Sequence, residues 1–343
     1  MRSCVFNRTV VGLSLMGLLI FGGTLLYRDP FFHYHGPIDD DYCIDGKYER
    51  YYNDGFLKYF DYDAIILGTS MCNNFRTSTV QNLFDVDSAI KVNASGAYFN
   101  ETNGYLQMAF GYNNSIELII RSIDLDYLTC EKDEESMYAQ EAYYLRDSNV
   151  WNDVNYVLNK KVMLEIFNPS MTDWDKYSSW HQVPAGRDIV LKGSEPYPAT
   201  VPLQCKIDDE IYQTISGNIS QNIVDIMKEN SDTEFYLFFT PYSICAWGDW
   251  LYAGEVEIQI QAQKIAIEQI LQCDNAHLFS LCNNFSMVCD LDNYIDKRHY
   301  VGKINEEILY CMYRGDYEIT LENYQEYLDE IETFYIEYPY SSL

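Results

Sequence analysis

The sequence predicts an α/β fold with a mainly parallel sheet, preceded by one N-terminal transmembrane helix. Two observations lead to this prediction. Short apolar runs, typical of buried parallel strands, alternate along the chain with longer amphipathic stretches of helical period. A long uncharged apolar run stands at the N-terminus, before the first of these strands.

The N-terminal run extends from Thr9 to Tyr27 and follows Arg2 and Arg8. About 20 apolar residues are enough for a helix to cross a bilayer. Basic residues at the start of the run favour a cytoplasmic N-terminus, which places the rest of the chain outside the cytoplasm. We therefore expect residues 1–28 to form a cytoplasmic stub and a membrane anchor. The alternatives are a cleaved signal peptide, although no A-x-A-like site follows the run, and a helix buried in a core.

The rest of the chain divides into a collar, a domain and a tail. Residues 29–60 are polar, rich in tyrosine and without helical period, so we interpret them as a juxtamembrane collar. A single α/β domain is expected over residues 61–315, with a helical insertion over the sheet at about 131–205. An acidic C-terminal helix is predicted over residues 316–343, with Thr320 as its N-cap.

Five apolar runs are predicted to form the strands of the sheet. The clearest run ends at Gly68. The five runs cover residues 62–67, 89–93, 116–125, 235–239 and 277–281. Helices are predicted over residues 208–230 and 255–272, because apolar residues recur there near a period of 3.6.

The composition excludes several classes of protein. The chain has 343 residues, with 52 acidic and 23 basic side chains and a formal net charge of −29. Nucleic-acid binding needs clustered Lys and Arg, so no nucleic-acid partner is expected. Apolar residues make up 48% of the chain, which is enough for a sizeable core and argues against wholesale disorder. For a domain outside the membrane, the acidity disfavours phosphate-rich polymers and favours a neutral glycan as substrate.

The ten cysteines show no metal-binding pattern. There is no C-x-x-C motif and no Cys/His spacing suited to zinc, so we expect no metal site and no cofactor. Cys282 and Cys289 are candidates for a disulfide. The alternative is that the cysteines are small, buried, reduced side chains.

A candidate nucleophile follows the first predicted strand, in the segment Gly68-Thr69-Ser70-Met71. In parallel α/β sheets, ligands gather beyond the carboxyl ends of the strands. A serine in the first turn of the next helix lies among unpaired backbone N–H groups, which stabilise an oxyanion. The alternative is that Ser70 is only a helix N-cap.

A candidate general base lies near the other end of the domain, where His299 follows Asp296 by three residues. A carboxylate can hold the imidazole in one tautomer, so that the imidazole can take a proton from a hydroxyl and return it to a leaving group. The alternative is an incidental histidine in a surface turn. The remaining histidines are expected to have no such partner and are interpreted as structural; they are His33, His35, His181 and His277.

Together these motifs resemble those of the SGNH (GDSL-type) hydrolase family. The segment 68–71 is similar to the family's first block, and Asp296 with His299 to its last. Gly96, in the segment Asn93-Ala94-Ser95-Gly96-Ala97, matches the block whose glycine N–H joins the oxyanion hole. The resemblance covers roughly residues 60–315, and further segments resemble membrane-anchored members of bacterial cell envelopes. These segments are DGFLKYFDYD at 54–63, Pro241-Tyr242-Ser243, and KINEEIL at 303–309.

The resemblance implies a three-layer α/β/α sandwich and a serine esterase or O-acyltransferase acting on acyl esters of an envelope glycan. Ser70 would be the nucleophile, His299 the base and Asp296 its orienting carboxylate. The expected partners are an acylated glycan or acyl donor, the membrane through the N-terminal helix, and a membrane-bound acyltransferase. This last partner follows from the distant relation of the group to proteins of alginate O-acetylation and teichoic acid D-alanylation.

One residue departs from the family pattern. Where the third block usually supplies an Asn as a third oxyanion donor, this chain has Asp124. An ionised carboxylate would repel an oxyanion, so Asp124 points elsewhere, is protonated, or leaves the hole to the N–H groups of Ser70 and Gly96. Asn73 and Asn74 follow the nucleophile and are candidate replacement donors. The departure also supports an alternative function, a glycan-binding or assembly protein on a catalytically degenerate scaffold.

Overall fold

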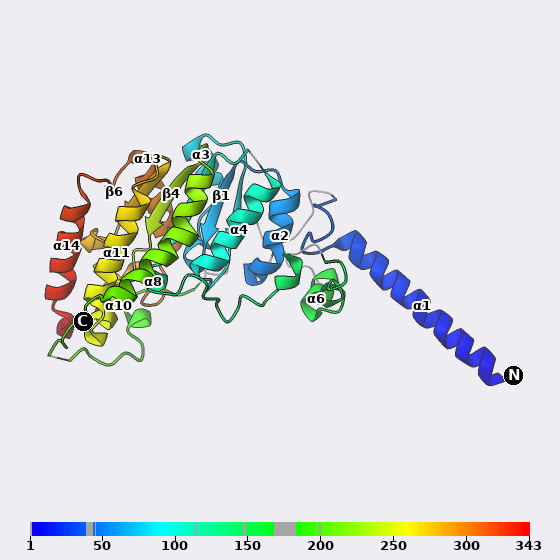
Figure 1. Ribbon diagram of the computed structural model, residues 1–343. Coiled ribbons are helices and arrows are strands. Elements are labelled where there is room, and N and C mark those ends of the chain that lie inside the picture. Colours follow the sequence, from blue (N-terminus) through cyan, green and yellow to red (C-terminus); the bar gives the residue numbers. More distant parts are fainter. Residues whose placement is uncertain are drawn as a thin grey trace. The chain divides into compact units, whose positions relative to one another are not determined.

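The structure, a computed structural model, describes residues 2–38, 44, 46–113, 115–146, 149–167, 183–198 and 200–343. These residues form two compact units (Figure 1). The first unit consists of the described residues within 1–60 and 140–174. The second unit consists of those within 61–139 and 175–343, and it contains the sheet. The segment 131–205, predicted to be one insertion, thus contributes to both units.

The N-terminal helix α1 (Arg2–Arg28) begins the first unit. Its stretch Val5–Arg28 is long and apolar enough to cross a membrane, with a mean hydropathy of 2.0. Only 6% of this apolar stretch is buried, which argues against a buried core helix. The further helical segments of the unit are η1 (Gly46–Tyr48), α2 (Glu49–Tyr59), η4 (Tyr143–Leu145), α5 (Val154–Val157) and α6 (Lys160–Phe167).

Helix α2 corrects the prediction that residues 29–60 lack helical structure. Its aromatic residues recur every four positions, and this spacing aligns them on one side of a helix. The rings of Tyr52 and Phe56 stack at 5.4 Å between centroids, and those of Phe56 and Phe60 meet edge to face at 5.1 Å. The many other tyrosines of this segment hide the period in the sequence.

The second unit is built on a six-stranded sheet with the order β2-β1-β3-β4-β5-β6 (Figure 1). The strands are β1 (Ala64–Gly68), β2 (Ala89–Asn93), β3 (Leu118–Ile123), β4 (Glu234–Phe239), β5 (Ala276–Ser280) and β6 (Glu318–Ile319). All neighbouring pairs are parallel except β5–β6, which is antiparallel. The predicted α/β class, the mainly parallel sheet and its five runs are therefore confirmed, and the two-residue β6 was not predicted.

Helices connect and flank these strands (Figure 1). They are α3 (Thr77–Phe84), α4 (Phe99–Tyr112), α7 (Arg187–Val190), α8 (Asp209–Ile219), α9 (Asp225–Glu229), α10 (Ile244–Ala253), α11 (Val256–Ile270), α12 (Phe285–Cys289), α13 (Gly302–Arg314) and α14 (Tyr324–Glu337). Helix α3 packs against α13, whereas α11 packs against both α8 and α14. The predicted helix over 208–230 is interrupted by a π-helical turn at Ser220–Val224.

The C-terminal helix begins later than predicted, because α14 starts at Tyr324 and Asn323 precedes it. Thr320 is therefore not its N-cap. The Thr320 hydroxyl instead accepts a hydrogen bond from the backbone N–H of Glu322, in the turn that follows β6. Pairing of β6 with β5 holds the chain extended up to Ile319, which delays the helix by one turn.

Candidate active site

Ser70 lies directly beyond the carboxyl end of β1. It begins η2 (Ser70–Cys72), a single 3₁₀ turn rather than the longer helix expected, with Thr69 in extended conformation before it. The Thr69 hydroxyl accepts a hydrogen bond from the N–H of Met71 at 3.3 Å, so Thr69 and not Ser70 caps the turn. The Ser70 side chain is therefore available for other contacts.

Gly68 is required by the close packing beneath this turn. A Cβ atom at position 68 would lie 2.3 Å from Oγ of Ser122 and 2.5 Å from Sγ of Cys72. Real Cβ atoms essentially never approach another heavy atom of this kind within 3.0 Å. The glycine thus lets β1, β3 and the Ser70 turn approach each other.

The side chains of Ser70, His299 and Asp296 form one chain of hydrogen bonds. Oγ of Ser70 lies 2.8 Å from Nε2 of His299. Nδ1 of the same ring lies 2.7 Å from Oδ2 of Asp296, which also accepts the backbone N–H of His299 through Oδ1 at 2.8 Å. A serine, an imidazole and a carboxylate in this order are the groups that activate a hydroxyl nucleophile.

The ionic state of Asp296 suits this arrangement. Burial works to raise the pKa of Asp296, but the hydrogen bond from the His299 ring, the charge of that ring and two backbone N–H groups outweigh it. The pKa of Asp296 is therefore lower than that of an ordinary aspartate. An ionised Asp296 holds the proton of His299 on Nδ1 and leaves Nε2 facing Ser70 as the acceptor.

The loop that carries His299 is tied to three other parts of the second unit. The guanidinium of Arg298 makes a bidentate ion pair with Asp126, which follows β3. Nζ of Lys297 binds Asp249 of α10 at 2.7 Å, and the Lys297 carbonyl accepts from Oγ of Ser243 at 2.6 Å. Two further hydrogen bonds close the loop. The Tyr294 hydroxyl donates to the Pro241 carbonyl at 2.8 Å, and the Ile295 N–H donates to the His299 carbonyl at 2.9 Å.

Gly96 lies in a turn next to the Ser70 turn. The register of the sheet pairs Gly68 with Asn93, so the segment after β2 runs beside the segment after β1. The N–H of Ala94 donates to the Gly68 carbonyl at 2.9 Å, which holds the two segments together. Gly96 has φ of +68°, a backbone conformation that favours glycine, and the Tyr138 ring would lie 3.4 Å from a Cβ there.

Buried polar residues that were not predicted order the loop after Ser70. Lys91, on β2, donates from Nζ to the carbonyls of Asn73 and Phe75, each at 2.8 Å. The Asn73 side chain accepts from Asn93 at 2.9 Å. Asn305 of α13 donates to the Met71 carbonyl at 2.9 Å. Sequence reasoning could have noticed Lys91, because a lysine in an otherwise apolar strand requires a buried partner.

Asn74, one of the two candidate replacement donors, is 5% exposed. In the sequence it follows Asn73, whose amide reaches the Ser95 hydroxyl at 3.4 Å in the Gly96 turn. The neighbouring Asn73 thus links the Ser70 and Gly96 turns.

Asp124 lies at the end of β3, as the sequence indicated, and is 1% exposed. Both carboxyl oxygens are buried, and neither makes a hydrogen bond of good geometry with the part of the chain that the structure describes. Burial raises the pKa of Asp124 to about 7, and the nearby Asp126 adds to this. The hydroxyl of Thr69 and the charges of His299 and Arg121 offset part of the effect. Burial therefore favours the protonated form of Asp124, which is one of the alternatives that the sequence left open.

A cavity of about 460 Å³ has Val301 in its lining, and Val301 follows His299 by two positions in the sequence. It is lined by Arg76, Val183, Val301, Gly302, Lys303, Glu306 and Tyr310. Arg76 and Glu306 form an ion pair at 3.7 Å, while no acidic side chain is paired with Lys303 in the structure as described. The lining thus includes the residues that follow His299 in the sequence, and it carries a cationic lysine in a chain that is otherwise strongly acidic.

Two other histidines have acidic partners that the sequence did not reveal. His33 lies between Asp54 at 3.6 Å and Asp153 at 3.3 Å. His277 lies between Glu318 and Glu234, at 3.1 and 3.2 Å. The statement that these histidines lack a partner is wrong, because each partner comes from a distant part of the chain. His35 binds the carbonyls of Gly36 and Leu26, and His181 is outside the described residues.

The cysteines whose side chains the structure describes are all free thiols. Cys282 is buried and Cys289 is partly buried, and they form no disulfide with each other. Among the described residues, no three His, Cys, Asp or Glu side chains are placed to hold a metal ion.

No family model, no curated protein and no solved structure matches this chain. The chemical interpretation therefore depends on the geometry of the residues themselves.

Proposed function

We propose that the protein is an SGNH-type serine esterase or O-acyltransferase, anchored by its N-terminal helix and acting outside the cytoplasm on acyl esters, preferably acetyl esters, of a cell-envelope glycan. The observation that carries the proposal is the hydrogen-bonded chain Ser70–His299–Asp296, with distances of 2.8 and 2.7 Å. Such a chain is expected where a hydroxyl must be activated, and a purely structural histidine does not need it.

In the proposed reaction, Oγ of Ser70 attacks the acyl carbonyl while Nε2 of His299 takes the hydroxyl proton. Asp296 stabilises the imidazolium that forms. The N–H groups of Ser70 and Gly96 bind the oxyanion of the tetrahedral intermediate. His299 then returns the proton to the leaving sugar oxygen, and an acyl-serine remains. Water or a sugar hydroxyl attacks this ester in turn and loses its proton to His299. The bond between the acyl carbon and Oγ of Ser70 then breaks, and His299 returns the proton to that oxygen, which completes hydrolysis or transfer.

The order of the elements supports the family assignment. Ser70 follows β1, Gly96 follows β2, and His299 follows β5, as the resemblance requires for the first, second and last blocks. Helices on both sides of this sheet would complete the three-layer α/β/α sandwich. The N-terminal helix, by its length and composition, supports a membrane anchor. Arg2 and Arg8 at its start favour a domain outside the cytoplasm, and a membrane-bound acyltransferase is the partner that we propose for acyl supply.

The cavity that Val301, Gly302 and Lys303 help to line is the proposed place for the glycan portion of the ester. A volume of about 460 Å³ lies within the range of small-ligand sites. The cationic lining modifies the expectation of a neutral glycan, because Lys303 would pair well with a carboxylate or phosphate on the substrate. Comparison of KM for neutral and uronic acid acetyl esters, in wild type and Lys303→Ala, tests this point.

Labelling of the full-length protein in detergent by a fluorophosphonate tests the enzyme proposal. We expect wild type to be labelled at Ser70 and the Ser70→Ala variant not to be labelled. Ser122→Ala, which removes a neighbouring hydroxyl, is the control and should keep the label. Absence of labelling in wild type, or equal labelling of Ser70→Ala, would overturn the proposal.

The second candidate function is a glycan-binding or assembly protein on a degenerate scaffold. The observation that favours it is the buried Asp124 at the position of the expected third oxyanion donor, because an ionised carboxylate there opposes oxyanion formation. This candidate requires glycan binding that is unchanged in Ser70→Ala, together with no turnover of any acyl ester.

A further inference from the structure

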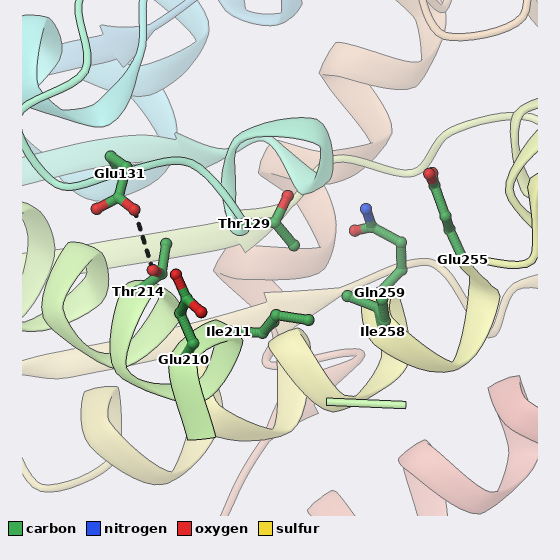
Figure 2. Close-up of a pocket in the computed structure, with 8 residues that line it drawn as sticks. All are labelled: Thr129, Glu131, Glu210, Ile211, Thr214, Glu255, Ile258 and Gln259. Atoms are coloured by element: carbon green, nitrogen blue, oxygen red, sulfur yellow. Dashed lines mark hydrogen bonds between the residues drawn. The ribbon is translucent and has the colours of Figure 1, made fainter. Parts of the chain in front are cut away.

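A second cavity, of about 380 Å³, lies between α8, α11 and the segment after β3 (Figure 2). Its lining residues are Thr129, Glu131, Glu210, Ile211, Thr214, Glu255, Ile258 and Gln259. Three of these side chains are carboxylic acids, and no lysine or arginine lines the cavity in the described structure. None of these residues belongs to the candidate active site.

The polar groups are arranged in two sets on opposite sides of the cavity. Figure 2 shows Glu131, Glu210 and Thr214 on one side and Glu255 with Gln259 on the other, with Ile211 and Ile258 between them. Glu255, which directly precedes α11, and Gln259 are one helical turn apart, which directs their side chains to the same side. The cavity therefore has two acceptor ends, and Ile211, Ile258 and Thr129 lie between them.

Gln259 provides a separate indication that a ligand is missing. This side chain is 5% exposed, and its Oε1 atom is buried without a hydrogen-bond partner among the described residues. A buried amide oxygen without a partner costs free energy, because it has lost its hydrogen bonds to water. A ligand that carries N–H groups would satisfy it.

Helix capping does not account for the carboxylates. Asp208 already caps α8 by accepting the N–H of Ile211 at 2.9 Å. Glu131 accepts only the hydroxyl of Thr214 at 3.1 Å through Oε1, and Glu255 makes no side-chain cap on α11. The cavity thus concentrates negative charge with few internal partners.

We propose that this cavity binds an aliphatic diamine or polyamine. One ammonium group would pair with Glu131 and Glu210, and a second with Glu255 and the Gln259 carbonyl oxygen. The methylene chain between them would lie on Ile211 and Ile258. A single metal ion fits less well, because the carboxylates do not converge into a group that could hold one. This site does not depend on the proposed esterase activity.

Calorimetric titration of the full-length protein in detergent with 1,5-diaminopentane and with spermidine tests the proposal. We expect saturable 1:1 binding, at least tenfold weaker with pentylamine, which has one ammonium group. Glu255→Gln and Gln259→Leu should each weaken diamine binding about tenfold or more. Glu257→Gln is the matched control, because it removes an equal charge from the same helical turn outside the cavity, and it should change affinity less than twofold.

A diffuse attraction of cations to a chain of charge −29 predicts a different set of results. Glu257→Gln would then weaken binding as much as Glu255→Gln does, and Mg²⁺ would displace the diamine at equal concentration. Either result, or the absence of saturable binding, would overturn the proposal. Thermal melting of each variant, followed by circular dichroism, shows whether a variant that no longer binds the diamine is still folded.

Discussion

Nε2 of His299 lies 2.8 Å from Oγ of Ser70, although the two residues are 229 positions apart in the sequence. Ser70 is held by the packing around Gly68 and by the Lys91 contacts to the following loop, whereas His299 is held by its own tethered loop. The two halves of the candidate site are thus held largely by different contacts, and the hydrogen bond from Asn305 of α13 to the Met71 carbonyl links them. Each half allows predictions of its own.

The first prediction concerns Asp296. Asp296→Asn keeps the shape of the side chain but no longer holds the His299 proton on Nδ1. We expect kcat for an acetyl ester such as p-nitrophenyl acetate to fall about 10³- to 10⁴-fold, with little change in Tm. Asp274→Asn, which removes one exposed charge elsewhere, should have the activity of wild type. A loss below tenfold in Asp296→Asn would mean that Asp296 does not orient His299.

The second prediction concerns the ion pair of Arg298 with Asp126. Both side chains are partly exposed, so the pair itself contributes little to the free energy of unfolding. Its role is to position the His299 loop, and Arg298→Gln or Asp126→Asn should each lower kcat roughly 10- to 100-fold. KM should change less than kcat.

A double-mutant cycle checks that these two residues act as a pair. The kcat of the double variant should be about equal to that of the less active single variant, since either change alone already releases the loop. Additive losses in kcat would show that the two side chains act separately and would contradict the prediction.

The third prediction concerns the pH dependence that Asp124 imposes on stability. Its pKa is about 7 in the folded protein and has the ordinary value of 3.8 in the unfolded chain. Between these two values the folded state binds more protons, so the free energy of unfolding falls as pH rises from about 4 to about 7 and then changes no further on this account.

Asp124→Asn cannot ionise and should escape this loss. We expect its Tm to exceed that of wild type by roughly 2–6 °C at pH 8 and to equal or fall below it at pH 4. Asp232→Asn, an exposed change of the same charge, is the control and should show no such pH-dependent difference. An equal Tm difference at both pH values would contradict the prediction.

The fourth prediction compares two glycines. Gly68→Ala introduces a Cβ that would lie within 2.5 Å of two side chains, so we expect a loss of about 1–3 kcal/mol in the free energy of unfolding and loss of fluorophosphonate labelling. Gly104→Ala, in the middle of α4 with no atom within 4 Å of the new Cβ, should be neutral or stabilising by about 0.5–1 kcal/mol. Denaturant unfolding measures both. Equal effects of the two changes would show that packing at Gly68 is not tight.

The sequence predicts the sheet well because buried parallel strands are nearly continuous apolar runs. The run before Gly68 is one example, and the structure places β1 within one or two residues of it. Helix α2 was missed because its aromatic period is hidden among other tyrosines, and β6 because two residues are too few to show a pattern.

Short segments of the sequence predict only part of the candidate site. Ser70 and the Asp296–His299 pair stand in short recognisable segments, so they could be chosen in advance. The side chains that hold these residues in place could not be chosen in advance, since Asp126 and Lys91 act on residues far along the chain. The same reason hid the acidic partners of His33 and His277, because pairing across the fold leaves no spacing in the sequence.

The tethers of the His299 loop have a consequence for how the proposed enzyme would divide its product between hydrolysis and transfer. Arg298, Lys297 and Tyr294 fix the loop without any contribution from a substrate. The base is therefore ready for whichever hydroxyl reaches the acyl-serine first. Under this proposal the outcome depends on how well a bound sugar shields the acyl-serine from solvent, and evolution could convert an esterase into a transferase by reshaping the entrance alone.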